Sequence, residues 1–160
     1  MTDFSDLPLA TRVFLAAYRW RRIDPVPWAP LRKPLAECTA GLVSTAGLVP
    51  PEQPPFDDDV KGGDSSFRLL DSNVDLATLV DTHRSKSYDH AGIHADANLA
   101  FPLTRLRELA SEGVIGSVSP RQLSFMGSIT ATSRLVRETA PAAAEEFVRD
   151  GVDVALLVPV

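Results

Sequence analysis

Apolar residues recur every three or four positions near the start of the chain, which predicts an amphipathic helix from about residue 8 to residue 22. The apolar stripe of this helix consists of Leu9, Val13, Ala17 and Trp20. Four prolines follow between residues 25 and 34. Because proline fixes its own backbone and lacks an amide donor, this stretch is expected to be extended. Residues 1–35 are therefore predicted to form a helix and a proline-rich lead-in.

Short apolar runs further along the chain predict buried strands. Residues 39–45 are small, apolar or β-branched, which is typical of a buried strand. Residues 152–160 read Val-Asp-Val-Ala-Leu-Leu-Val-Pro-Val, a pattern typical of a central parallel strand. Two shorter strands are predicted at residues 66–70 and 76–80.

Two more helices are predicted between these strands. The first begins near Pro102, buries Leu103, Leu106 and Leu109 on one face, and ends at Gly113. The second covers residues 129–138 and either continues with a kink or restarts at Pro141. Gly151 is placed to end it.

The order of strand, helix and strand predicts an α/β fold with a Rossmann-like parallel sheet, in a single domain over residues 1–160. Open α/β sheets place their chemistry just beyond the carboxyl ends of the strands. The last predicted strand stops at Val160, without a following loop or helix. We therefore expect the domain to be incomplete, with part of its site encoded after Val160.

Composition narrows the class of protein. The chain is 44% hydrophobic and 23% charged, as ordinary globular proteins are, and its net charge of -5 argues against nucleic-acid binding. No apolar run approaches the roughly eighteen residues that span a membrane. The N-terminus lacks the apolar segment of a secretory signal, and a single cysteine, Cys38, suits a reducing compartment. These features predict a soluble cytoplasmic protein without nucleic-acid or membrane partners.

A polar segment over residues 81–98 shows little periodicity and is predicted to be a long loop. It carries three histidines and two neighbouring aspartates: His83, Asp89, His90, His94 and Asp96. Such a group could bind a metal ion, but Gly92 would weaken a helix that aligned His90 with His94. We therefore predict no metal site and an active-site loop, in which His90, His94 and Asp89 are the catalytic candidates. The alternative is a loop held by its own hydrogen bonds.

Three further residues are candidates for substrate binding. Ser44 and Thr45 end a predicted strand, where their hydroxyls could line the mouth of a site, although a plain turn would use the same residues. Arg68 could bind a substrate carboxylate, and a surface ion pair is its alternative role. Cys38 has no second cysteine or basic cluster beside it, which favours buried packing.

Several short segments, in order along the chain, resemble the selenoprotein B family of glycine, sarcosine, betaine and D-proline reductases, most of all the D-proline reductase branch. They are Val43-Ser44-Thr45-Ala46-Gly47, Gly63-Asp64-Ser65-Ser66-Phe67-Arg68, Ser87-Tyr88-Asp89-His90, Asp96-Ala97-Asn98 before Phe101-Pro102, Leu106-Arg107-Glu108-Leu109, Gly116-Ser117 and Ser124-Phe125-Met126-Gly127. The resemblance implies a reductase that cleaves the carbon–nitrogen bond of a small amine or amino acid.

The resemblance also implies where the nucleophile lies. In that family the strand matching residues 152–160 leads into a Sec-x-x-Cys or Cys-x-x-Cys motif, which this chain lacks. A UGA selenocysteine codon after Val160, translated as a stop, would explain this.

The expected full-length product contains selenocysteine and receives electrons from a thioredoxin-like or dithiol donor. A partner subunit would carry a pyruvoyl group. The 160 residues themselves would bind no cofactor and would be inactive. A non-catalytic binding or assembly module and a metal-dependent hydrolase using the histidine loop are the alternatives.

Overall fold

The computed structural model describes residues 6–18 and 22–160, which fall into two units, residues 1–30 and 31–160. The first unit contains α1 (Leu9–Ala17), which begins directly after Pro8. This confirms the first part of the predicted N-terminal helix. Residues 19–21, which include Trp20 of the predicted stripe, lie outside the described residues.

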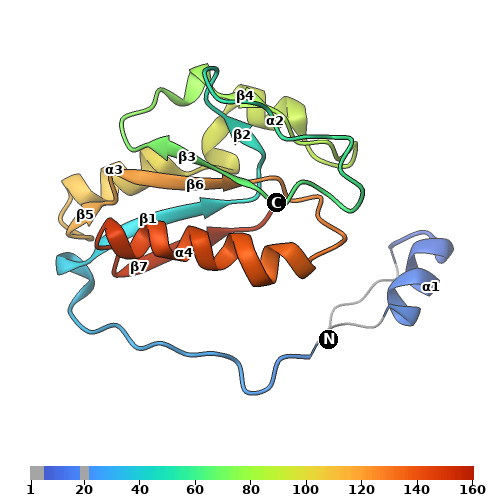
Figure 1. The fold of residues 1–160 in the computed structure, drawn as a ribbon, viewed down its shortest axis with the longest axis horizontal. Coiled ribbons are helices and arrows are strands. Elements are labelled where there is room, and N and C mark those ends of the chain that lie inside the picture. The colour runs from blue at the N-terminus through green and yellow to red at the C-terminus, as the bar shows by residue number, and fades with distance from the viewer. Residues whose placement is uncertain (1–5, 19–21) are drawn as a thin grey trace. The chain divides into compact units, whose positions relative to one another are not determined.

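The second unit is built on a five-stranded sheet with β1 (Thr39–Ser44) in its middle (Figure 1). On one side β1 pairs in parallel with β7 (Val154–Val158). On the other side it pairs in parallel with β5 (Ser117–Val118) and then with β6 (Arg121–Phe125). β3 (Phe67–Asp71) is antiparallel to β6 at the far edge. The predicted α/β fold with a mostly parallel sheet is confirmed.

Helices cover both faces of this sheet (Figure 1). Leu42 of β1 is fully buried in the cluster that contains Leu103 and Leu106 of α3 (Leu103–Ser111). On the opposite face Phe147 of α4 (Ala140–Arg149) lies against Gly41, where an added Cβ would come within 2.7 Å of the ring. The lack of a side chain at Gly41 therefore allows α4 to approach the sheet closely.

The helix before β7 continues through Pro141 and does not restart there. A π-helical turn at Leu135–Thr139 runs directly into α4, and Pro141 is the second residue of α4. Gly151, with φ of 69°, follows the helix as predicted.

Three predictions about local structure are wrong. Residues 76–80 are mostly not a strand, because Asp75 caps a 3-10 turn over Leu76–Thr78. Only Val80–Asp81 (β4) forms a strand here, paired with β2 (Leu48–Val49) in a separate two-stranded sheet. β7 is parallel but not central, since among the described residues it pairs with β1 alone.

The third error concerns the polar segment, which is not a single long loop. It contains the short helix α2 (His90–Ala95) and a 3-10 turn at Ala97–Leu99. Asp89 caps the first of these and Asp96 caps the second, each accepting a hydrogen bond from a backbone N–H. These two aspartates of the polar segment therefore stabilise two short helical segments as N-caps.

The side chain of Gln122 is buried between β1 and the turn that separates β5 from β6, and it pairs with backbone groups of both. Gln122 is fully buried, and its Oε1 accepts a hydrogen bond of 2.7 Å from the Leu42 N–H. Its Nε2 donates to the Ser119 carbonyl at 2.6 Å. The amide thereby satisfies backbone groups that a continuous strand would have paired.

Candidate active site

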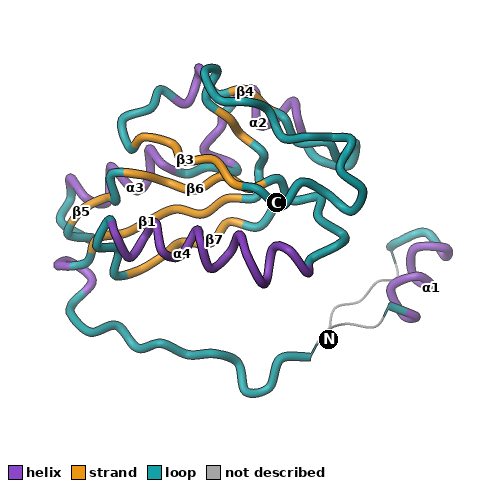
Figure 2. The backbone as a smooth tube through the Cα atoms, in the orientation of Figure 1, coloured by secondary structure: helices purple, strands orange, loops and turns teal. Residues whose placement is uncertain are grey.

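A cavity of about 480 Å³ lies beyond the carboxyl ends of β6 and β7. Its walls are His83, Ser85, Ser87, Tyr88, Asp89, Ile93, Leu99, Gly127, Ser128 and Val160. Figure 2 shows loops gathering at this end of the sheet, around the C-terminus. Binding sites of open α/β sheets are found at this position, so the cavity is the candidate site.

Asp81 is the residue that organises the wall of the cavity formed by residues 83–90. Its side chain is 4% exposed, and its Oδ1 accepts a 2.9 Å hydrogen bond from the His83 N–H. Its Oδ2 lies 2.5 Å from His90 Nδ1 and 3.4 Å from His94 Nε2. A single buried carboxylate therefore fixes both the backbone at His83 and the exposed face of α2.

His90 and His94 reach the same oxygen because they lie one turn apart on α2. The helix forms although Gly92, which is expected to weaken it, lies between the two histidines. The Gly92 N–H donates to the capping Asp89 Oδ1 at 3.0 Å, and an added Cβ at Gly92 would lie 2.4 Å from Asp89 Oδ2. Glycine thus allows the cap carboxylate to lie against the helix.

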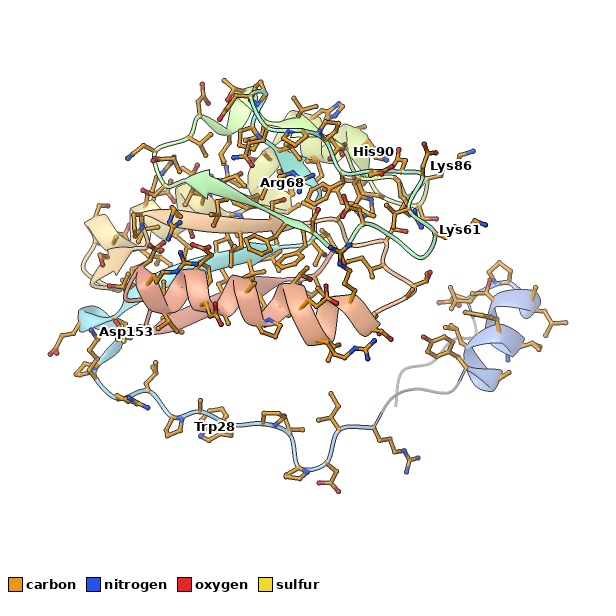
Figure 3. All side chains as sticks on the ribbon, in the orientation of Figure 1. Trp28, Lys61, Arg68, Lys86, His90 and Asp153 are labelled. Atoms are coloured by element: carbon orange, nitrogen blue, oxygen red, sulfur yellow. The ribbon has the colours of Figure 1, made fainter. Side chains whose placement is uncertain are left out.

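The surroundings of His90 favour its protonated form. Its Nδ1 faces Asp81, and its Nε2 lies 3.1 Å from the Ser85 carbonyl oxygen, so both ring nitrogens face acceptors. The hydrogen bond to Asp81, and then the one to the Ser85 carbonyl, raise the pKa of His90. His90 does not line the cavity, and His94 lines a separate recess beside Asp96. Figure 3 shows His90 on the loop side of the domain.

His83 has the opposite electrostatic environment. It is 7% exposed and its ring stacks on Tyr88 with centroids 4.2 Å apart. Burial lowers the pKa of His83 and raises the pKa of Tyr88 to about 12, so both side chains are neutral at neutral pH. Both line the cavity, and neither His83 Nε2 nor the Tyr88 hydroxyl has a hydrogen-bond partner among the described residues.

The sequence matches one protein family along almost its whole length. The model of the glycine/sarcosine/betaine reductase selenoprotein B family covers residues 8–159. The chain belongs to this family. The resemblance deduced from the short segments is thereby confirmed.

Named relatives are subunits of reductases. The chain is 32% identical over 136 residues to D-proline reductase subunit gamma of Acetoanaerobium sticklandii, which covers 84% of this chain and 54% of that protein. It is 28% identical over 146 residues to glycine reductase complex component B subunit gamma of Symbiobacterium thermophilum, covering 90% of this chain and 33% of the relative. For sarcosine reductase complex component B subunit beta of Peptoclostridium acidaminophilum the identity is 26% over 147 residues, with coverage of 90% and 33%. The chain thus spans between a third and about half of these relatives, and no solved structure gives a significant match.

The hydroxyl groups of Ser44 and Thr45, predicted to bind substrate, form hydrogen bonds within the protein. Ser44 is fully buried, donates to the Ala100 carbonyl at 2.6 Å, and accepts from the Ala46 N–H at 3.1 Å. Thr45 Oγ1 accepts from the Val160 N–H at 2.9 Å and joins the ends of β1 and β7. Neither residue lines the cavity, and a role in substrate binding stays a prediction for both.

Arg68 is also engaged with the protein itself. Its guanidinium lies 4.3 Å from the centre of the Phe56 ring and donates to three carbonyl oxygens and one hydroxyl, those of Pro54, Pro55, Phe67 and Ser66. With these acceptors in place, the side chain holds the proline loop against β3 (Figure 3). Its predicted role in binding a carboxylate stays a prediction.

Within residues 6–18 and 22–160, no three or more His, Cys, Asp or Glu side chains form a group that could hold a metal ion. In the same part of the chain, no helix has the length and apolarity to cross a membrane.

Sequence reasoning missed the main polar residues of the cavity. In the sequence, His83 stands out only as a neighbour of the other histidines, and Tyr88 only as part of a segment that resembles the family. The stacking of these two rings is a tertiary contact five residues apart in a non-helical loop, which no periodic pattern reveals. The position of His83 two residues after the end of a strand is the available signal.

The two environments predict that His83 titrates at lower pH than His90. His90, with a raised pKa, contributes stability that is complete below its unfolded value of about 6.5 and is lost as pH rises through the folded pKa. His83, with a lowered pKa, contributes stability above about 6.5 that is lost as pH falls through its folded pKa. NMR titration of the ring protons, assigned with His83→Gln and His90→Gln, measures the order, and the reverse order would contradict these environments.

Proposed function

We propose that this chain is part of a selenol- or thiol-dependent reductase subunit that cleaves the carbon–nitrogen bond of a small amine or amino acid. Glycine, sarcosine, betaine and D-proline are the substrate candidates, because the family and the relatives are named for their reduction. The family match over residues 8–159 carries the proposal. The cavity beyond β6 and β7 is the proposed substrate site.

The nucleophile is proposed to come from outside residues 1–160. The single cysteine, Cys38, is fully buried, and its Sγ lies 3.4 Å from the Pro34 carbonyl oxygen. A buried thiol of this kind cannot reach a substrate in the cavity. We propose a selenocysteine or cysteine that enters the cavity beside Val160, with a resolving cysteine near it.

The proposed reaction needs two electrons. The selenolate or thiolate forms a bond to the substrate carbon, and the amine leaves with a proton. A resolving thiolate then attacks the selenium or sulfur, so that the carbon is released with the electron pair and takes a proton. An external dithiol reduces the resulting selenenylsulfide or disulfide. A pyruvoyl group of a partner subunit is the proposed holder of the amine.

The nucleotide sequence after the codon for Val160 tests the source of the nucleophile. We expect a UGA codon in an open frame, followed by a cysteine codon three positions later. A UAA or UAG stop, together with no partner subunit that carries the motif, would contradict this source.

Activity is tested on the intact protein with any subunits that co-purify. Oxidation of dithiothreitol is measured with each of the four candidate substrates, and the released or ring-opened amine product is identified by mass spectrometry. The expected result is substrate-dependent oxidation that Cys38→Ala leaves unchanged. If no candidate is reduced by a preparation containing the redox motif, the proposed function is wrong.

A further inference from the structure

Two polar atoms of the cavity wall lack partners. His83 Nε2 and the Tyr88 hydroxyl are shielded from water and have no hydrogen-bond partner among the described residues. A buried polar group without a partner costs about 1–3 kcal/mol, and a water molecule or a ligand commonly satisfies such a group. Their two rings are stacked, which places both in one wall of the cavity.

The hydrogen bonds around His83 determine which ring nitrogen carries the proton. The Ser85 N–H points to His83 Nδ1 at a distance of 3.3 Å, so Nδ1 is the acceptor. In the neutral ring the proton then resides on Nε2. The unpartnered ring nitrogen of His83 is therefore an N–H donor, and it cannot act as a base through Nε2 in this form. A neutral imidazole used as a donor is a known way of binding a substrate oxygen.

The Asp81 carboxylate, the His90 ring and the Ser85 carbonyl together hold His83 in this orientation. Asp81 accepts from its backbone N–H, and His90 ties Asp81 to the Ser85 carbonyl. These bonds fix both ends of the turn over residues 83–85. Asp81 and His90 are thus positioning residues, since neither lines the cavity.

We propose that His83 Nε2–H, with the Tyr88 hydroxyl, binds a carboxylate oxygen of an amino-acid substrate. The proposal relies on the proposed function for the substrate class. Asp89 lines the same cavity, and its carboxylate would face the ammonium group of the free substrate before the pyruvoyl group of a partner subunit takes over the amine. Arg68, the earlier candidate for the carboxylate, is occupied by carbonyl oxygens of the proline loop. The cavity would therefore bind the two charged ends of a small zwitterion at different walls.

Binding to the intact protein tests this assignment. Calorimetric titrations use acetate, glycine and methylamine, which separate the carboxylate from the ammonium group. His83→Phe keeps a ring for stacking on Tyr88 and removes the donor, whereas His83→Gln keeps an N–H. We expect His83→Phe to weaken acetate and glycine binding about tenfold or more, as the loss of a hydrogen bond to a charged group does, and to leave methylamine binding unchanged. His83→Gln should retain most of the affinity.

The ¹⁵N NMR shifts of the histidine rings test the tautomer without any variant. We expect the proton of His83 on Nε2 and a shift of that nitrogen on addition of acetate. A proton on Nδ1, equal acetate binding by His83→Phe and the unaltered protein, or no binding of acetate and glycine at all would overturn the inference. Acetate binding through His83 in a protein that reduces none of the four candidate substrates would refute the proposed function and the amino-acid substrate, and would leave only the binding of a carboxylate by His83 standing.

Discussion

Asp81→Ala is expected to lower the free energy of unfolding by about 2 kcal/mol and to disorder the cavity wall. The substitution leaves the partly buried His83 N–H without an acceptor, a loss of about 1–3 kcal/mol. It also removes the common partner of His90 and His94 on α2, an additional loss that water partly screens. The carboxylate itself is 4% exposed, so water cannot easily replace it.

Urea unfolding at several pH values measures this effect. The difference between the two proteins should shrink as pH rises through the raised pKa of His90, because the neutral ring attracts Asp81 less. Asp71→Ala is the matched control, since Asp71 Oδ1 also accepts from the N–H two residues on, that of Asn73, but is exposed. Equal losses for the two variants would contradict the assignment of Asp81 as the organising residue.

Gly127→Ala is expected to separate the ends of β1 and β7 and to abolish most of the activity. An added Cβ would lie 2.8 Å from the Val160 carbonyl oxygen and 2.9 Å from that of Thr45. Both contacts are with backbone, so rotating a side chain cannot relieve them. Overpacking of this kind costs about 1–3 kcal/mol. Because Gly127 and Val160 both line the cavity, the strand shift should also change its shape.

Gly113→Ala is the control for this variant. Gly113 has φ of 72° and no atom within 4 Å of an added Cβ, so alanine there meets only backbone strain of about 1–2 kcal/mol. Urea unfolding and dithiol oxidation are measured for both variants. Activity is expected to survive in Gly113→Ala and to be lost in Gly127→Ala, and full activity in Gly127→Ala would contradict the placement of the site.

The sequence predicts those elements whose burial follows a simple period. β1 and α3 carry continuous or helically spaced apolar residues, and each forms as expected. β7 forms at the expected place, but its residues are half-buried or exposed, whereas its apolar run predicts a buried strand. β6 was not predicted, because it contains Gln122 and Ser124, which read as exposed polar residues but are fully buried. Gln122 can be buried only because two backbone groups from other segments pair with its amide.

The site was predictable only in part for the same reason. The spacing of His90 and His94 was visible in the sequence, but their common partner, Asp81, lies outside that motif. The neutral state of His83 depends on burial against Tyr88, which is a property of the folded loop. Family resemblance identified the segments around these residues without assigning their contacts.

An experimental structure of the intact protein with a bound amino acid that it reduces tests the central claim most directly. The account predicts the amino acid in the cavity beside Val160, with a carboxylate oxygen within hydrogen-bond distance of His83 Nε2. An amino acid bound at another place, with this cavity free of substrate, would contradict it.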